Sequence, residues 1–471
     1  MPGPSPKPCV GLLALTLEFY ESKMPDLRPG RENWLRKTVL PALETVAEVR
    51  FDQAVYRRED VDNIVREFER DGVEVLLVVC LTYSPSLLSL PALQHTSLPI
   101  VVWNTQELFA VDADFDGKAM IANHGVHGTQ DLCNVLARGK VPFEYITSHL
   151  NDSDAIANLA EILTAGAAVS RLRHTRLGLM GYPFPGMGDM AVDTAHLANT
   201  LGCQSISIAV EELNERAEAV GGEEVLELTN VYRQTYLVAD DIVDEDLEAT
   251  ARVELALRSM VADYRLDAVT YQFLALGESE QTMTLPFVAA GRLMAEGIGF
   301  GGEGDLVAAT GSWFLNQLAP PATFSEVFTT DFGGNALLMS HMGEANAAMA
   351  RSDCKIRLVA RQKGIVPTRR RQLALAVSLE PGPATLCCLT LGAAGRWRMI
   401  TGRVEVADFG PLEPLTVPHF KLRIPNGDVR QWLTAYAKAG GAHHNAVCFG
   451  DATAKIRSAA GLLGADYIEI S

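Results

Sequence analysis

The stretch Val73-Glu-Val-Leu-Leu-Val-Val-Cys80 decides the fold class of the first part of the chain. It is an almost unbroken run of Val, Leu and Cys, which is typical of a strand buried on both faces of a parallel sheet. Further strand patterns lie at residues 10–16 and 100–103, and helical patterns lie at residues 32–46 and 60–71. Strands that alternate with helices at this spacing indicate a parallel, doubly wound sheet.

The same alternation starts again near residue 175. Strand patterns at residues 177–180, 205–210 and 268–273 enclose helical patterns at residues 191–201 and 244–264. This order predicts a second α/β domain with a parallel sheet.

The pattern changes after about residue 354. Four apolar or alternating runs follow, separated by Gly and Pro: residues 355–360, 372–379, 384–391 and 397–407. They indicate an antiparallel β region, either a barrel or a sandwich, and a short α/β tail closes the chain. We therefore predict an α/β fold of two doubly wound parallel-sheet domains, residues 1–170 and 171–321, followed by a β-rich, barrel-like C-terminal domain at residues 322–471.

Composition and charge exclude several classes of protein. The 471 residues are 48% hydrophobic and 21% charged, which excludes a disordered chain. A formal charge of −18 would repel nucleic acid and anionic lipid, so we expect neither as a partner. The eight cysteines form no C-x-x-C pair, the first residues lack a convincing cleavage site, and the longest apolar stretch is about half of a membrane span. We expect a cytoplasmic protein with reduced thiols.

Several motifs carry potential metal ligands. The segment Gly299-Phe-Gly-Gly-Glu-Gly-Asp305 holds Glu303 and Asp305 among glycines, which allow positive φ and close approach of the chain to a ligand. An interhelical turn is the alternative for this segment. Glu326 precedes Ser340-His341-Met-Gly-Glu344, and Gly440-Gly-Ala-His443-His444 comes near the end. Carboxylates and imidazoles together suit Mn²⁺, Co²⁺, Fe²⁺ or Zn²⁺. From the spacing of these residues alone, a metal site and a purely structural role for buried histidines are equally good interpretations.

Two further motifs have weaker signals. In Asn123-His124-Gly-Val-His127-Gly128 the two histidines could share one helix face, or they could face solvent in the first turn of a helix. The motif Gly186-Met-Gly-Asp-Met-Ala191 follows a strand and precedes a helix, as a dinucleotide fingerprint does. Four residues separate the strand from the first glycine, where the fingerprint has a tight turn, so a plain βα loop is the better interpretation.

These motifs, in the order in which they occur along the chain, resemble those of the L-arabinose isomerase family. The resemblance runs over most of the chain, and its specific elements are Gly-Glu-Gly-Asp, residues 302–305, and Gly-Gly-Ala-His-His, residues 440–444. It implies an aldose–ketose isomerase that uses a divalent metal, usually Mn²⁺, and a hexamer in which one subunit's N-terminal domain completes a neighbour's site. The implied fold is again two α/β domains and a β-rich third.

The resemblance also assigns roles to residues of this chain. The implied metal ligands are Glu303, Glu326, His341 and His444. Glu303 and Glu326 would also be the catalytic pair that moves a proton between C1 and C2 of the sugar through an enediol, a kind of acid–base catalysis that supplies about 10²–10⁴-fold. The metal would stabilise the developing negative charge as a Lewis acid.

Three segments depart from the family. Ser-Gln-His-Leu-Tyr is replaced by Thr16-Leu-Glu-Phe-Tyr20, His-Thr-Gln-Phe by Asn104-Thr-Gln-Glu107, and Asn-Gln-Thr-Ala-His by Asn123-His-Gly-Val-His127. The metal ligands are therefore kept while the residues that contact the sugar differ. We predict a sugar substrate other than L-arabinose. The predicted substrate contacts are His124, His127, Glu18, Glu107, Gln272 and His443.

The sequence thus favours a metal-dependent aldose–ketose isomerase that forms a homo-oligomer. Two alternatives stay open. The same pocket could serve a hydrolase or epimerase that processes glycosides or sugar acids, because two carboxylates can flank a glycosidic bond. The chain could also be a non-catalytic sugar-binding protein.

Overall fold

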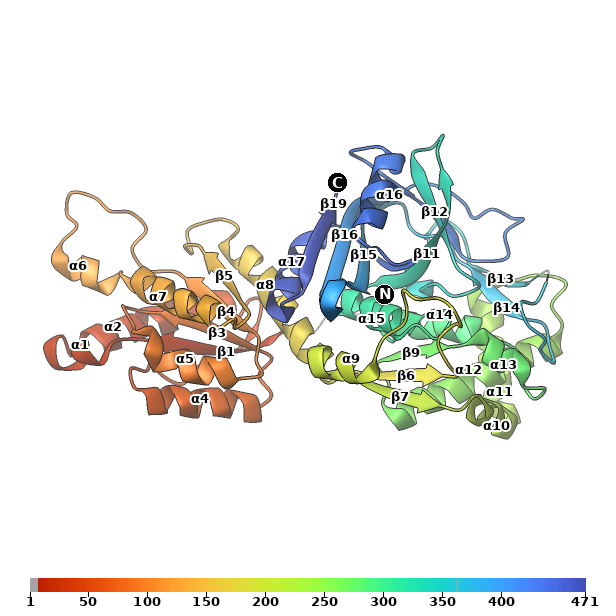
Figure 1. Ribbon diagram of the computed structural model, residues 1–471, viewed down its shortest axis with the longest axis horizontal. Coiled ribbons are helices and arrows are strands. Elements are labelled where there is room, and N and C mark those ends of the chain that lie inside the picture. The colour runs from red at the N-terminus through yellow and green to blue at the C-terminus, as the bar shows by residue number, and fades with distance from the viewer. Residues whose placement is uncertain (1–6, 362) are drawn as a thin grey trace. The chain divides into compact units, whose positions relative to one another are not determined.

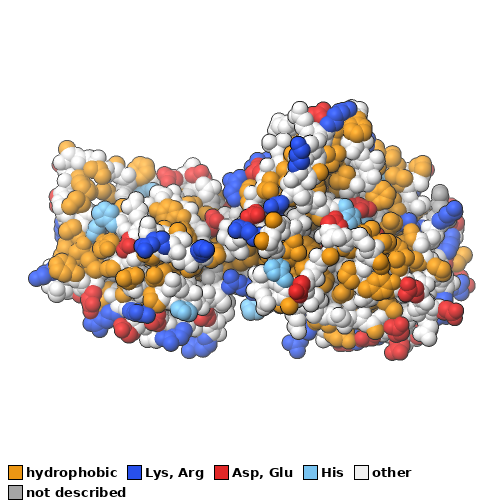
Figure 2. All heavy atoms as spheres, viewed as in Figure 1, with side chains coloured by type: hydrophobic (Ala, Val, Ile, Leu, Met, Phe, Trp, Pro, Cys, Tyr) orange, Lys and Arg blue, Asp and Glu red, His pale blue; other side chains and the backbone are white. Residues whose placement is uncertain are grey.

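The structure is a computed structural model that describes residues 7–361 and 363–471. Its chain forms two compact units (Figure 1). The N-terminal unit contains residues 7–171 together with residues 457–465, and the barrel unit contains the described residues of 172–456 and 466–471. Figure 2 shows acidic and basic side chains interspersed over the visible face of each unit. The division into three domains remains a prediction.

The N-terminal unit is built on a parallel sheet with the strand order β2-β1-β3-β4-β5. The strands are β1 (Cys9–Leu15), β2 (Glu48–Arg50), β3 (Val75–Cys80), β4 (Ile100–Asn104) and β5 (Phe143–Thr147). Every residue of β3 is buried, because helices cover both of its faces. Leu76 and Val78 pack into one apolar cluster and Leu77 and Val79 into the opposite one. The prediction of a doubly wound sheet is confirmed here.

Helices of this unit flank the sheet on both sides (Figure 1). They are α1 (Glu18–Lys23), α2 (Leu27–Trp34), the π-helix η1 (Leu35–Val39), α3 (Leu40–Leu43), α4 (Arg58–Arg70), α5 (Ser86–His95), α6 (Gly117–Ala122), α7 (Gly125–Arg138) and α8 (Ala155–Leu172). In length and composition α8 could cross a membrane, with a mean hydropathy of 1.2. It is 50% buried, and core helices of soluble proteins pass the same test, so this is weak support for a span.

The barrel unit begins with a second parallel sheet in the order β10-β9-β6-β7, which confirms the second α/β layer. The strands are β6 (Arg176–Met180), β7 (Gln204–Ile208), β9 (Ala268–Tyr271) and β10 (Gly299–Gly301). The helices around it are α9 (Thr194–Leu201), α10 (Val210–Ala219), α11 (Gly222–Thr235), α12 (Asp244–Tyr264), α13 (Phe273–Glu278), α14 (Phe287–Ala295) and α15 (Leu306–Leu318).

A closed antiparallel barrel follows, as the fold prediction requires. Its strand order is β15-β18-β11-β12-β17-β16, and β16 pairs back to β15. The strands are β11 (Ala322–Asp331), β12 (Ala336–Ser340), β15 (Gly382–Leu391), β16 (Trp397–Val406), β17 (His419–Arg423) and β18 (His444–Phe449). Closure pairs both edges of the sheet, and apolar side chains such as Leu337, Leu386 and Phe420 fill the interior.

The remaining elements complete this unit. The strand β19 (Asp466–Ile470) adds to β16 in parallel. The short helices are η2 (Ala347–Met349), η3 (Ala393–Gly395), α16 (Val429–Lys438) and α17 (Thr453–Leu463), and from residue 457 onward α17 belongs to the N-terminal unit. Two strands that the sequence assigns to the antiparallel β region, β13 (Arg357–Ala360) and β14 (Leu373–Ala376), lie outside the barrel. They form a separate small sheet with β8 (Leu237–Val238). Their apolar composition predicts a strand but does not specify its partner.

Candidate metal centre

The Gly-Glu-Gly-Asp loop directly follows β10 and has a strained backbone. Glu303 has a φ of 60°, in the left-handed region that non-glycine residues rarely adopt. A Cβ at Gly304 would lie 2.4 Å from the carbonyl oxygen of Tyr182, and one at Gly302 would lie 2.7 Å from Nε2 of His341. The two glycines therefore let the loop approach its neighbours closely. The segment is a strand-to-helix loop that presents Glu303, and not the interhelical turn that the sequence analysis left as an alternative.

Three histidines surround this loop, and each one is held by its own carboxylate. Nδ1 of His444, at the start of β18, lies 2.8 Å from Oδ2 of Asp305. Nδ1 of His341, which follows β12, lies 2.7 Å from Oε2 of Glu344. The third pair joins Nδ1 of His443 and Oδ2 of Asp189 at 2.6 Å. Carboxylates that accept from one ring nitrogen in this way fix the orientation of the imidazole and leave the other nitrogen free for a ligand.

The other ring nitrogens converge without protein partners. Nε2 of His341, His443 and His444 is buried, and it has no hydrogen-bond partner among the described residues. Nε2 of His444 lies 3.8 Å from Oε2 of Glu303, and Nε2 of His443 lies 4.0 Å from the same oxygen. Potential ligand atoms of Glu303, His443 and His444 all lie within 4.8 Å of one another. Buried polar atoms without partners need a ligand, and this donor set suits a divalent cation.

Glu326 and Phe324 of β11 border the same group. Glu326 is paired in register with His444 on one side and with Ser340 on the other. The ring of Phe324 contacts the rings of His341 and His444 edge-on, with centroids 4.8 and 4.9 Å apart. This aromatic contact restricts both imidazoles.

Charges within the site shift its pKa values. Burial alone would raise the pKa of Glu303, but the nearby histidines His443, His341 and His444 hold it below its ordinary value. The carboxylate of Glu303, followed by that of Asp189, raises the pKa of His443 to about 9 against the opposing effect of burial. Burial lowers the pKa of His341, but Glu344 raises it further, so the net shift is upward. Negative carboxylates therefore favour positive charge at this centre.

The structure thus brings part of the predicted ligand set together. Glu303 and His444 lie in the closest group, and its third member is His443, which the sequence analysis placed as a substrate contact. His341 and Glu326 lie next to this group, the first directly after β12 and the second on β11. The metal and catalytic roles of all these residues remain predictions.

Gln272, a predicted substrate contact, has both ends of its amide occupied. Its Nε2 donates to the carbonyl oxygen of Glu303 at 3.1 Å, and its Oε1 accepts from the backbone N–H of Leu274 at 3.1 Å. The side chain is fully buried. In this state Gln272 supports the backbone of the Glu303 loop, and a contact with substrate stays a prediction.

The other predicted contacts belong to the N-terminal unit, where they follow strands or begin helices. Glu18 pairs with Arg57 at 3.2 Å, and Glu107 pairs with Arg31 at 2.5 Å. His124 precedes α7, and its Nε2 lies 3.0 Å from the hydroxyl of Tyr20. The ring of the exposed His127 packs edge-on against His124. These positions lie at the carboxyl edge of the sheet, where open α/β sheets bind ligands.

Sequence reasoning did not predict that three carboxylates hold the histidines, although Asp305 and Glu344 lie in motifs with potential metal ligands. Asp305 lies two residues after Glu303, and Glu344 lies three residues after His341. Their closeness in sequence to the predicted ligands could have pointed to these two carboxylates. Asp189 lies in the Gly186–Ala191 motif, more than 250 residues before His443 along the chain. No local pattern predicts that contact. The motif itself is a loop, and α9 begins only at Thr194.

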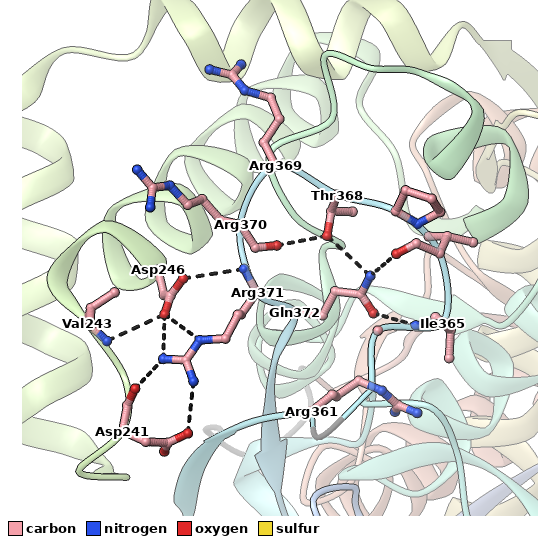
Figure 3. A pocket seen from close by; sticks show the side chains of 13 residues that line it. Asp241, Val243, Asp246, Arg361, Ile365, Thr368, Arg369, Arg370, Arg371 and Gln372 are labelled. Carbon is pink, nitrogen blue, oxygen red and sulfur yellow. Dashed lines mark hydrogen bonds and ion pairs between the residues drawn. The ribbon is translucent and has the colours of Figure 1, made fainter.

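A cavity of about 940 Å³ lies elsewhere in the barrel unit. Figure 3 shows that its basic side chains are partly neutralised, because Arg371 contacts both Asp241 and Asp246. Arg369 is paired with Glu218. This cavity contains none of the orphaned ring nitrogens and is not the candidate centre.

Comparison with known proteins shows the family of the chain. Residues 187–318 match the family model of the L-arabinose isomerase central domain, and residues 321–466 match that of the C-terminal domain. The L-arabinose isomerase of Nocardioides sp. is 30% identical over 379 residues, 77% of this chain and 73% of that protein. The enzyme of Acidothermus cellulolyticus is 28% identical over 408 residues, 83% of this chain and 79% of that protein.

Among solved structures, a periplasmic solute-binding protein from Actinobacillus succinogenes with bound D-allose aligns at 15% identity and a TM-score of 0.16, covering 58% of this chain and 82% of that one. A likeness this low supports no conclusion about fold or function. The similarities to isomerases do not favour the hydrolase, epimerase or sugar-binding alternatives.

Proposed function

Because this chain belongs to the L-arabinose isomerase family and is therefore a sugar isomerase, we propose that it converts an aldose other than L-arabinose into its ketose with a divalent metal, Mn²⁺. The main support for a metal is a group of three buried ring nitrogens beside Glu303 that have no hydrogen-bond partner among the described residues. The glycine at position 302 keeps space beside one of them, where a Cβ would lie 2.7 Å from His341 Nε2. The proposed ligands are Glu303, Glu326, His341 and His444.

The residues of the chain would share the chemistry as follows. The bound ion supplies Lewis-acid stabilisation of negative charge on the sugar oxygens. Glu303, ionised because its pKa is lowered, would accept the proton from C2 of the open-chain aldose, which leaves an enediolate, and the C2 hydroxyl proton passes to O1. Return of a proton to C1 then leaves the carbonyl at C2 and a hydroxyl at C1. Glu326 is the second carboxylate of the pair, and His443 holds a sugar oxygen.

The substrate proposal depends on the N-terminal unit. The family's Gln-His and His-Thr-Gln-Phe positions are Leu17-Glu18 and Asn104–Glu107 in this chain, and a histidine stands at position 124. Carboxylates in place of neutral or aromatic side chains change the hydrogen-bond acceptors offered to a sugar. We extend the proposal to His124, His127, Glu18 and Glu107 as sugar contacts. A homohexamer and a cytoplasmic location also stay predictions.

A panel of aldoses in D₂O tests both parts of the proposal. Metal-stripped protein is incubated with each aldose, with and without Mn²⁺, and products are followed by NMR. We expect ketose with deuterium at C1 only in the Mn²⁺ samples, and faster turnover of another aldose than of L-arabinose. Absence of turnover with every aldose would overturn the isomerase proposal, and fastest turnover of L-arabinose would overturn the substrate proposal.

A further inference from the structure

The loop between β6 and α9 contacts both segments that carry the candidate centre. The backbone N–H of Phe184 donates to the carbonyl oxygen of Glu303 at 2.9 Å. Five residues later, Oδ2 of Asp189 accepts from the backbone N–H of His443 at 3.0 Å and lies 2.6 Å from Nδ1 of the same residue. Met190 is almost fully buried and anchors the loop. One loop therefore fixes the Glu303 loop and His443 together.

His443 differs from the other two imidazoles in its exposure. The side chain of His443 is 36% exposed, whereas those of His341 and His444 are 3% and 1% exposed. Its ring lies against that of His444, with centroids 4.0 Å apart. An accessible imidazole beside a buried one is placed to contact an entering ligand. Without a partner for Nδ1, such a ring could rotate about its side-chain bonds.

We propose that Asp189 is a positioning residue of the isomerase site, which clamps His443 at its backbone N–H and at Nδ1 and so presents Nε2 to a sugar oxygen. This inference rests on the proposed function. Two contacts from one carboxylate oxygen fix both the main chain and the ring, whereas a single contact would leave one of them mobile. Misplacement of a catalytic contact by about 1 Å can cost about 10²-fold in rate.

Other contacts hold the backbone around His443 but leave its ring free. Nδ2 of Asn445 donates to the carbonyl oxygen of His443 at 2.9 Å. The hydroxyl of Tyr436 donates to the carbonyl oxygen of Ala442 and is bonded to Oδ1 of Asn445. Loss of the Asp189 carboxylate should therefore leave the segment in place and release mainly the imidazole.

The experiment is a double-mutant cycle with Mn²⁺-loaded full-length protein. We expect Asp189→Ala to lower kcat and to raise KM, so that kcat/KM falls about 10–100-fold, and the affinity for Mn²⁺ to stay unchanged. In a His443→Ala background the same substitution should have no further effect, since Asp189 acts through His443. Asp189→Asn, which keeps an acceptor oxygen, should recover much of the lost kcat.

Asp193→Ala is the matched control on the same loop. Its carboxylate accepts from the backbone N–H groups of Ala195 and His196 at the start of α9 and has no contact with His443 among those described. We expect a lower melting temperature and an unchanged kcat. Additive effects of Asp189→Ala and His443→Ala, or a Mn²⁺ affinity that falls with kcat in Asp189→Ala, would overturn the inference.

Binding of pentitols, measured by calorimetry, separates the two proposals. If the wild type turns over an aldose and Asp189→Ala behaves like Asp193→Ala, the positioning role fails while the isomerase stands. If the wild type turns over no aldose, the proposed function fails. The positioning role still holds in that case if Asp189→Ala weakens pentitol binding at least tenfold with unchanged Mn²⁺ affinity, and it fails if pentitol binding is unchanged.

Discussion

The candidate centre in the barrel unit and the carboxyl edge of the sheet in the N-terminal unit both combine carboxylates with histidines, but they do so differently. In the barrel unit, Asp189, Asp305 and Glu344 each bond to an imidazole. In the N-terminal unit, Glu18 and Glu107 bond to arginines.

This difference suggests that the histidines of the barrel unit are held rigidly, whereas the carboxylates of the N-terminal unit can adapt to a ligand. A carboxylate paired with arginine is already neutralised, and an exposed pair contributes little to stability, so either partner can exchange for a ligand. A carboxylate bonded to one ring nitrogen leaves the other nitrogen of the imidazole free and aimed. Under the proposed function, the barrel unit would hold the ion in one geometry, and the N-terminal unit would offer groups that rearrange around the sugar.

The largest effect is expected for Glu303→Gln, which removes the proposed base and a proposed ligand. We expect kcat to fall by about 10²–10⁴-fold, because the amide can neither accept the C2 proton nor supply negative charge. Steady-state kinetics at saturating Mn²⁺ measures the change. Glu405→Gln, which alters an exposed pair with Arg423 on the barrel, is the control and should leave kcat unchanged. A Glu303→Gln variant with half of the wild-type kcat would contradict the role.

Glu344→Gln tests the rigidly held histidines of the barrel unit. Glu344 holds Nδ1 of His341 and accepts from the hydroxyl of Tyr271. We expect about 10–100-fold weaker Mn²⁺ binding, measured by competition with a chelator. Tyr271→Phe removes the hydroxyl but leaves Glu344 bonded to His341 and to the backbone N–H of Gly343, so its effect should be smaller. Equal effects of the two substitutions would show that the His341 contact is not what matters.

Glu107→Gln tests the arginine-bonded carboxylates of the N-terminal unit. If Glu107 contacts the sugar, loss of its charge should raise KM by about 3–10-fold, the equivalent of one hydrogen bond, and leave Mn²⁺ affinity unchanged. Kinetics with the best aldose of the panel measures KM. Glu18→Gln, which disrupts the pair with Arg57, provides a second position with the same expectation. An unchanged KM in both variants would remove these residues from the substrate site.

The smallest effect is expected for Asp116→Ala in the N-terminal unit. Asp116 caps α6 by accepting from the backbone N–H of Ala119 at 2.7 Å. Loss of such a cap costs about 0.5–2 kcal/mol. Hydrogen exchange should become faster in α6, with Mn²⁺ affinity unchanged. Weaker Mn²⁺ binding in this variant would show that the stability of the N-terminal unit affects the candidate metal centre of the barrel unit.

The strands and long helices were predictable because their patterns are local. The run that contains β3 is apolar on both faces, and the expected helix at residues 244–264 has the same bounds as α12. Pairing is not local, which is why β13 and β14 were assigned to the antiparallel β region but pair with β8. The same limit applies to the site. Glu303 and His444 were found through motifs, whereas the contact between Asp189 and His443 depends on how distant loops fold.

The segment of residues 457–465 has a consequence for how the chain folds during synthesis. It belongs to the N-terminal unit, where Oγ of Ser458 donates to Oε2 of Glu144 at 3.2 Å. The N-terminal unit therefore lacks a piece of itself until residues 457–465 have been translated, after all six strands of the barrel. Its completion must wait for the barrel sequence, so premature termination would leave both units unfinished.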